Sequence, residues 1–224
     1  MKKAIDFFTA HPARFFLLAA LLWGGFMCFL NFLDYKKGNF SWHDLLVEAN
    51  GMVFDLLVFG ILLSIYEKLR EKRDKIERLH EEIDDYRGWD EKEATFRIVG
   101  AVKRLNKLGV SKIDLHRCFL KKADLQGVNL YKANLEEANL EEAKLGGINL
   151  EEANLADAQI KDTILANAIL KNAILDVADS SNVDFYQAIV GKDWFEKLEK
   201  WGWDVKAMKK DYLIDENGVL RLKK

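Results

Sequence analysis

Residues 133–145 read Ala-Asn-Leu-Glu-Glu-Ala-Asn-Leu-Glu-Glu-Ala-Lys-Leu, and the same five-residue spacing extends in both directions. Every fifth position from Leu115 to Leu175 is Leu or Ile, and the position two residues earlier is small or apolar. An α-helix repeats every ~3.6 residues and a strand every two, so neither buries this pattern on one face. A chain that turns a corner every five residues does, and successive coils of about twenty residues must stack to bury a continuous core.

The stretch from 111 to 192 resembles the pentapeptide-repeat family, whose motif is Ala, then Asp or Asn, then Leu and two variable residues. Residues 123–125 (Ala-Asp-Leu) and 153–155 (Ala-Asn-Leu) match this motif. The resemblance implies a right-handed quadrilateral β-helix in which the central Leu and the preceding Ala point inward. Because the register ends with Phe185 and Val190, we expect larger side chains to cap the last coil.

Helical caps are expected at both ends, because an open solenoid exposes apolar surface and unpaired backbone. Residues 89–110 form the predicted N-terminal cap, since their apolar side chains follow helical spacing and Gly109 is a typical helix stop. Residues 193–224 form the predicted C-terminal cap, with a short helix that begins at Asp193 and a β-hairpin that turns at Asn217-Gly218.

Two apolar segments predict a transmembrane hairpin over residues 1–66. Residues 15–33 are almost wholly apolar and long enough for a helix to cross a bilayer. Residues 45–66 form the second predicted span, although they contain three strongly polar side chains. A soluble, buried helical hairpin is the alternative, but two aromatic-rich runs joined by a short polar loop favour membrane spans.

The basic residues around the two spans predict the orientation of the hairpin. Lys2, Lys3 and Arg14 precede the first span and a basic cluster follows the second, whereas the loop between them carries only Lys36 and Lys37. The positive-inside rule then places both termini and the solenoid in the cytoplasm. We therefore expect a two-pass protein of the inner (cytoplasmic) membrane, with a bacterial origin implied by the resemblance alone.

A coiled-coil-like helix is predicted for residues 67–88. Its apolar residues occupy heptad positions and form a narrow seam that begins inside the second span: Leu62, Ile65, Leu69, Ile76, Leu79 and Ile83. Such a seam favours the association of several chains into a homo-oligomer. The alternative is that the seam packs on the N-terminal capping helix of its own chain, after a turn at Gly88.

Glu48, Asn50 and Asp55 are polar residues within the second predicted span, and the heptad register places Glu48 and Asp55 in line with Leu62. An ionisable side chain inside a membrane is costly and usually faces a cavity or a partner. In a ring of subunits these residues would line a pore, as acidic rings do in cation channels. The alternative is that Asp55 is protonated, or that it pairs with a polar group such as Asn31.

Composition and motifs argue against an enzyme and against a nucleic-acid binder. The formal net charge is −2, whereas a general nucleic-acid binder is normally strongly basic. The two cysteines, Cys28 and Cys118, make no disulfide framework, and the four histidines lack metal-ligand spacing. The sequence contains no phosphate-binding glycine loop and no nucleophile motif. We therefore expect no catalytic residue, no cofactor and no metal site.

A DNA-mimic role is not expected. Some pentapeptide-repeat proteins are long acidic solenoids that mimic DNA, but this solenoid is short and its surface columns alternate in sign, as at Lys122 and Glu142. Two functional hypotheses remain. The preferred hypothesis is a membrane-anchored oligomeric scaffold that presents its solenoid to an unidentified cytoplasmic protein partner. Its partners would be the lipid bilayer, other copies of the chain and that protein, but not nucleic acid. The alternative is an oligomeric ion channel or membrane effector in which the second span lines a pore.

Overall fold

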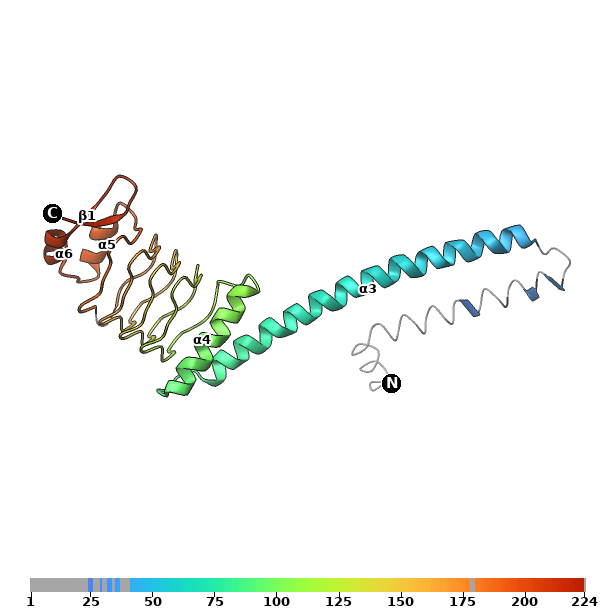
Figure 1. Cartoon of the computed structure of the whole chain (residues 1–224), viewed down its shortest axis with the longest axis horizontal. Coiled ribbons are helices and arrows are strands. Elements are labelled where there is room, and N and C mark those ends of the chain that lie inside the picture. The colour runs from blue at the N-terminus through green and yellow to red at the C-terminus, as the bar shows by residue number, and fades with distance from the viewer. Residues whose placement is uncertain are drawn as a thin grey trace. The chain divides into compact units, whose positions relative to one another are not determined.

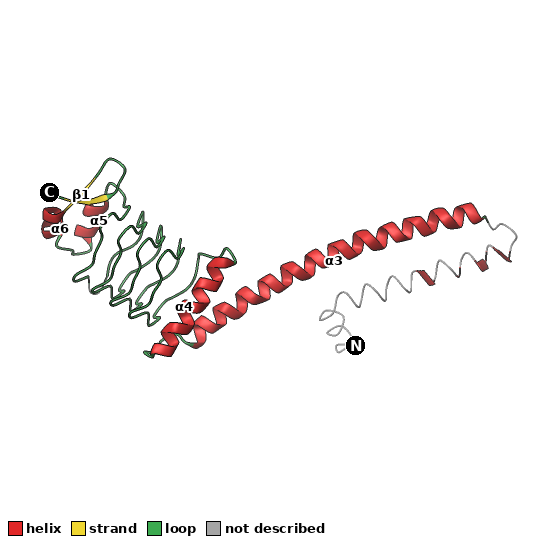
Figure 2. Cartoon of the chain, in the orientation of Figure 1, coloured by secondary structure: helices red, strands yellow, loops and turns green. Residues whose placement is uncertain are grey.

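The computed structural model describes residues 24, 25, 29, 32, 33, 35, 36, 41–177 and 180–223. The chain divides into two compact units, Met1–Lys72 and Arg73–Lys224. The described helices and strands are α3 (Trp42–Asp85), α4 (Lys92–Lys107), α5 (Trp194–Lys200), α6 (Val205–Asp211), β1 (Tyr212–Ile214) and β2 (Leu220–Leu222) (Figure 1). Between α4 and α5 the chain runs through stacked coils without long strands, drawn as loops in Figure 2.

Helix α3 contains both the predicted second span, 45–66, and most of the predicted coiled-coil-like helix, 67–88. The first predicted span, 15–33, falls almost wholly outside the described residues. Within the described part of the chain, none of the helices combines the length and the apolar character that a membrane crossing needs.

The predicted solenoid is confirmed. Backbone bridges join residues that lie twenty positions apart and run parallel, from Asp114 with Asn134 to Ile169 with Ile189. The Leu and Ile residues at every fifth position are at most 1% exposed, and the small residues two positions earlier are also buried, so both sets form one core. The inward side chains of every five-residue repeat are therefore buried inside the coil. Neither an α-helix nor a flat strand would bury residues at this spacing.

The corners of the coil explain why the repeat is five residues long. Two residues after each central Leu or Ile from Leu115 to Leu170, the backbone adopts a positive φ, for example 57° at Lys132 and 58° at Glu142. The backbone N–H one residue later donates to the carbonyl of that Leu, as from Ala133 to Leu130 at 3.0 Å. A four-residue turn whose third residue has positive φ matches a type II turn. Glycine occupies this position at Gly127 and Gly147.

The N-terminal cap covers the first coil with α4, which spans Lys92–Lys107 and ends before Gly109. Its side chains also bond the free backbone of that coil. The Asn106 amide donates to the Asn129 carbonyl at 2.8 Å and accepts from the Asn129 N–H at 2.6 Å. The Thr95 hydroxyl donates to the Phe119 carbonyl at 3.0 Å. The cap therefore satisfies polar groups that an open end would leave unpaired.

The C-terminal cap contains the expected short helix, α5, and a hairpin that closes the last coil. The hairpin differs from the predicted tight turn, because β1 and β2 are joined by five residues and only Gly218 of the Asn217-Gly218 pair has positive φ. The Gly218 carbonyl accepts from the Val190 N–H at 2.8 Å, and a Cβ at Gly218 would lie 2.6 Å from the Val190 carbonyl oxygen. A glycine here therefore lets the hairpin dock. Helix α6 was not anticipated.

Candidate functional site

The described apolar side chains of α3 in the first unit are largely exposed. Leu56, Phe59, Leu62, Ile65 and Leu69 have exposed fractions between 42% and 64%. A helix that is apolar around much of its circumference is normally covered by other helices or by lipid. This band, defined as the exposed apolar residues from Leu56 to Leu69, is a candidate interaction surface.

The predicted oligomer seam is divided between two environments. Leu62, Ile65 and Leu69 are exposed, as an association surface requires. Ile76, Leu79 and Ile83 instead pack in the core of the second unit, with Leu79 at 6% and Ile83 at 1% exposure. The interpretation of these last three as contacts to other copies is corrected, because they pack in the same core as the buried residues of the capping helix α4.

Glu48, Asn50 and Asp55, the predicted intramembrane polar residues, all lie in α3. The Asp55 side chain is exposed. The side chains of Glu48 and Asn50 fall outside what the structure describes. Their alignment along one helix face therefore remains a prediction from the heptad register.

Ion pairs join neighbouring coils on the surface of the N-terminal part of the solenoid. In four of them a basic residue pairs with the glutamate twenty positions later: Arg117–Glu137 at 2.7 Å, Lys121–Glu141 at 2.6 Å, Lys122–Glu142 at 3.3 Å and Lys132–Glu152 at 3.3 Å. The hydrogen bond from Arg117 lowers the pKa of Glu137. Three basic residues of the first coil thus pair with three of the four glutamates between Glu136 and Glu142. This part of the surface therefore lacks the continuous negative charge of a DNA mimic.

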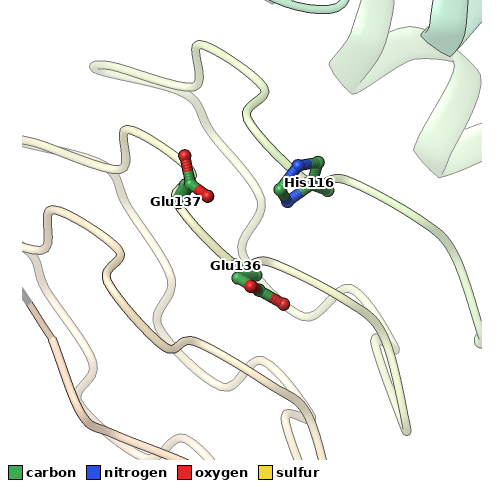
Figure 3. Close-up of side chains that lie close together, drawn as sticks. All are labelled: His116, Glu136 and Glu137. Carbon is green, nitrogen blue, oxygen red and sulfur yellow. The ribbon is translucent and has the colours of Figure 1, made fainter.

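His116, Glu136 and Glu137 form a mixed cluster on this surface (Figure 3). One ligand atom from each lies within 4.8 Å of the others, and the Nδ1 atom of His116 is buried without a hydrogen-bond partner among the described residues. Imidazole and carboxylate groups are suitable ligands for a divalent transition metal. The sequence analysis missed this cluster, although the twenty-residue spacing of His116 and Glu136 would have revealed it.

The carboxylates of this cluster already have partners. Both oxygens of Glu137 accept from Arg117, at 2.7 and 3.0 Å. Glu136 accepts from the Asn154 amide at 3.1 Å. A metal ion would have to displace these donors, so the geometry fits a surface hydrogen-bond network better than a preformed metal centre.

Comparisons with known proteins agree with this fold. The family model described as pentapeptide repeats matches in eight copies, over residues 111–147 and 133–172. The architecture is that of a right-handed β-solenoid built from stacked repeats. This segment is thus a run of pentapeptide repeats, a family whose members are generally structural or repeat proteins rather than enzymes. No match is found among curated proteins.

Solved structures of three pentapeptide-repeat proteins are similar to this chain. One from the Arabidopsis thaliana thylakoid lumen is 23% identical, with a TM-score of 0.34, over 40% of this chain and 66% of that one. One from the cyanobacterium Cyanothece 51142 is 33% identical, with a TM-score of 0.28, over 37% and 59%. HetL from Nostoc, involved in heterocyst differentiation regulation, is 28% identical, with a TM-score of 0.20, over 37% and 38%. The chain thus spans less than two thirds of each protein.

Proposed function

We propose that the chain is a membrane-anchored, oligomeric scaffold whose solenoid offers a rigid surface to a cytoplasmic protein partner. The observation that carries this proposal is the exposed apolar band on α3 from Leu56 to Leu69. Leaving such a band in water is costly, at about 25 cal/mol per Å² of apolar surface, so lipid or other copies of the chain are its natural cover. The repeat solenoid suits a binding surface because its coils are held rigidly in register.

We expect different residues of the band to contact other copies of the chain and to contact lipid. The seam residues Leu62, Ile65 and Leu69 recur at heptad spacing and suit helix association. Other exposed apolar residues in the band, such as Phe59 and Ile61, suit lipid. The predicted first span, 15–33, would supply the second helix of the membrane hairpin and a two-pass topology with both termini in the cytoplasm.

Two measurements on the full-length chain test this proposal. Alkaline carbonate washing of membranes should leave the protein in the pellet, and its mass in nanodiscs should correspond to two or more copies. Ile65→Gln with Leu69→Gln should lower that mass, whereas the exposed solenoid residue Ile174 provides a control as Ile174→Gln. Release by carbonate would overturn the anchor, and a monomer in nanodiscs would overturn the oligomer.

A channel is the second candidate, and the exposed Asp55 carboxylate on α3 favours it. In a closed ring this carboxylate and Glu48 would attract cations to a central path. Asp55→Asn should then change cation flux through liposomes that contain the full chain, without changing the oligomeric mass. Flux that is absent, or that is equal for both proteins, would leave Asp55 as a packing residue of the scaffold.

A further inference from the structure

A pocket of about 620 Å³ lies where the turn after α3 meets the start of α4, within the second unit. It is lined by Tyr86, Trp89, Asp90, Glu91, Glu93 and Ala94. Its volume falls within the range of about 300–1,000 Å³ that is usual for ligand sites. The residues that line the pocket do not belong to the apolar band on α3 or to the ion pairs between coils.

Two aromatic rings form one part of the pocket wall. Tyr86 and Trp89 pack edge to face, with ring centroids 5.8 Å apart and planes at 77°. Trp89 is nevertheless 57% exposed, which is unusual for the largest apolar side chain. An aromatic face that is open to solvent attracts a cation through its quadrupole.

Three carboxylates supply the rest of the polar lining. Glu93 pairs with Arg97 at 3.4 Å, but Asp90 and Glu91 form no ion pair among the described residues. Glu91 occupies the N-cap position of α4, yet its side chain makes no capping hydrogen bond. The hydrogen bond to Glu141 is the main cause that raises the pKa of Lys121, and the charge of Asp90 contributes less. The Lys121 ammonium group donates to Glu141 at 2.6 Å and not to Asp90. The carboxylates of Asp90 and Glu91 are therefore available to a cation from outside.

Arg97 indicates which cation suits this wall. Its guanidinium carbon lies 6.0 Å from the centroid of the Tyr86 ring, while its Nη2 atom pairs with Glu93. A guanidinium group can stack on a ring and bond a carboxylate at the same time, because it is planar and carries its donors in a fork. Trp89, Asp90 and Glu91 offer the same pair of interactions, and none of the cations that the structure describes makes an ion pair with these two carboxylates or stacks on this ring.

We propose that this pocket binds the side chain of an arginine carried by a partner protein. The inference rests on the proposed scaffold role, because that role supplies the partner protein that carries the arginine. The pocket would then hold the partner through one charged anchor, and the capping helix α4 would align that anchor with the first coil of the solenoid.

The test measures fluorescence anisotropy of a labelled peptide with two arginines flanked by Gly and Ser, mixed with the full-length chain in mild detergent. The matched probe replaces both arginines with citrulline, a neutral side chain of the same shape. We expect the arginine peptide to bind and the citrulline peptide not to bind. Trp89→Ala should weaken binding by about three- to thirtyfold, as loss of a cation–π contact predicts. Asp90→Asn with Glu91→Gln should weaken it further and reduce its salt dependence.

Two control variants lie outside the pocket. Tyr186→Ala removes an exposed ring from the solenoid, and Glu199→Gln removes an exposed carboxylate from α5. Both should bind the arginine peptide as the unmodified chain does. Equal binding of the two peptides, unchanged binding by Trp89→Ala, or equally tight binding of free arginine amide would overturn the proposal. The carbonate and mass measurements do not depend on this pocket, so the anchored scaffold can fail while the pocket holds, or the reverse.

Discussion

Arg117 and Glu137 lie twenty residues apart in the sequence and form a two-bond ion pair across adjacent coils. Arg117 Nε donates to Glu137 Oε2 at 2.7 Å, and Nη2 donates to Oε1 at 3.0 Å. The same spacing brings Lys121, Lys122 and Lys132 to their glutamates, so the twenty-residue length of one coil determines all four of these cross-coil pairs.

Reversing one member of this pair should destabilise the solenoid slightly. Glu137→Arg places two cations on adjacent coils, and the full-length chain should melt at a lower temperature in low salt. The double variant Arg117→Glu, Glu137→Arg should recover most of the loss. Because both side chains are exposed, the effect should be small and should fade in high salt. Purely additive effects of the two substitutions would contradict a direct pair.

A substitution at an inward position should be far more costly. Leu135 is fully buried, and Leu135→Ala should lower the free energy of unfolding by about 2–5 kcal/mol, because it removes apolar contacts and leaves a cavity. Ile164, on the outside of the same solenoid, is 41% exposed, and Ile164→Ala should cost much less. Urea unfolding followed by circular dichroism distinguishes them, and similar losses would argue against the inward–outward assignment.

The corners should reject β-branched residues. Asn172 has a φ of 55°, and Asn172→Val should destabilise the chain by about 1–2 kcal/mol, because the left-handed conformation crowds a branched Cβ. Asn172→Gly at the same exposed position should be tolerated, since glycine adopts positive φ without this clash. Thermal melting compares the two directly, and a Val variant as stable as the Gly variant would contradict the assigned turn.

The Cys118 thiol should be inert in the native protein. Burial is the main cause that raises its pKa to about 12, although the charge of Arg87 opposes the shift. In a Cys28→Ser background, Cys118 should not react with iodoacetamide at pH 8 until the chain is unfolded. Rapid labelling of the folded chain would show that the first coil opens readily.

The same shift makes a prediction about stability at alkaline pH. The folded thiol has a raised pKa, so its contribution to stability is fully present below the ordinary thiol pKa. It is lost as the pH rises from that value towards 12, because only the unfolded chain ionises over this range. Cys118→Ala should flatten this part of the pH profile in urea titrations of the full-length chain.

The fold of residues 111–192 could be predicted from the sequence because its signal is local and repeated. Each central Leu, such as Leu125, contributes the same inward position, and many repeats together exclude a helix or a flat sheet. The caps were predictable for a similar reason, since helical spacing before Gly109 and the aromatic residues after Asp193 each lie within one short segment. The loop of the terminal hairpin was not, because its path depends on the contact of Gly218 with Val190, a residue distant in the sequence.

The sequence by itself therefore determined the period, the inward residues and the positions of the two caps. Only the tertiary structure decided which residues of the apolar seam pack in the core of their own chain and which stay exposed. A heptad pattern cannot distinguish a second copy of the chain from a helix of the same chain, because both offer an apolar surface. Only the turn at Gly88 assigns Leu79 and Ile83 to the core while Leu62 stays exposed. The same turn brings Tyr86 into one pocket with Glu93 and Ala94 of α4, and the sequence alone does not reveal this grouping.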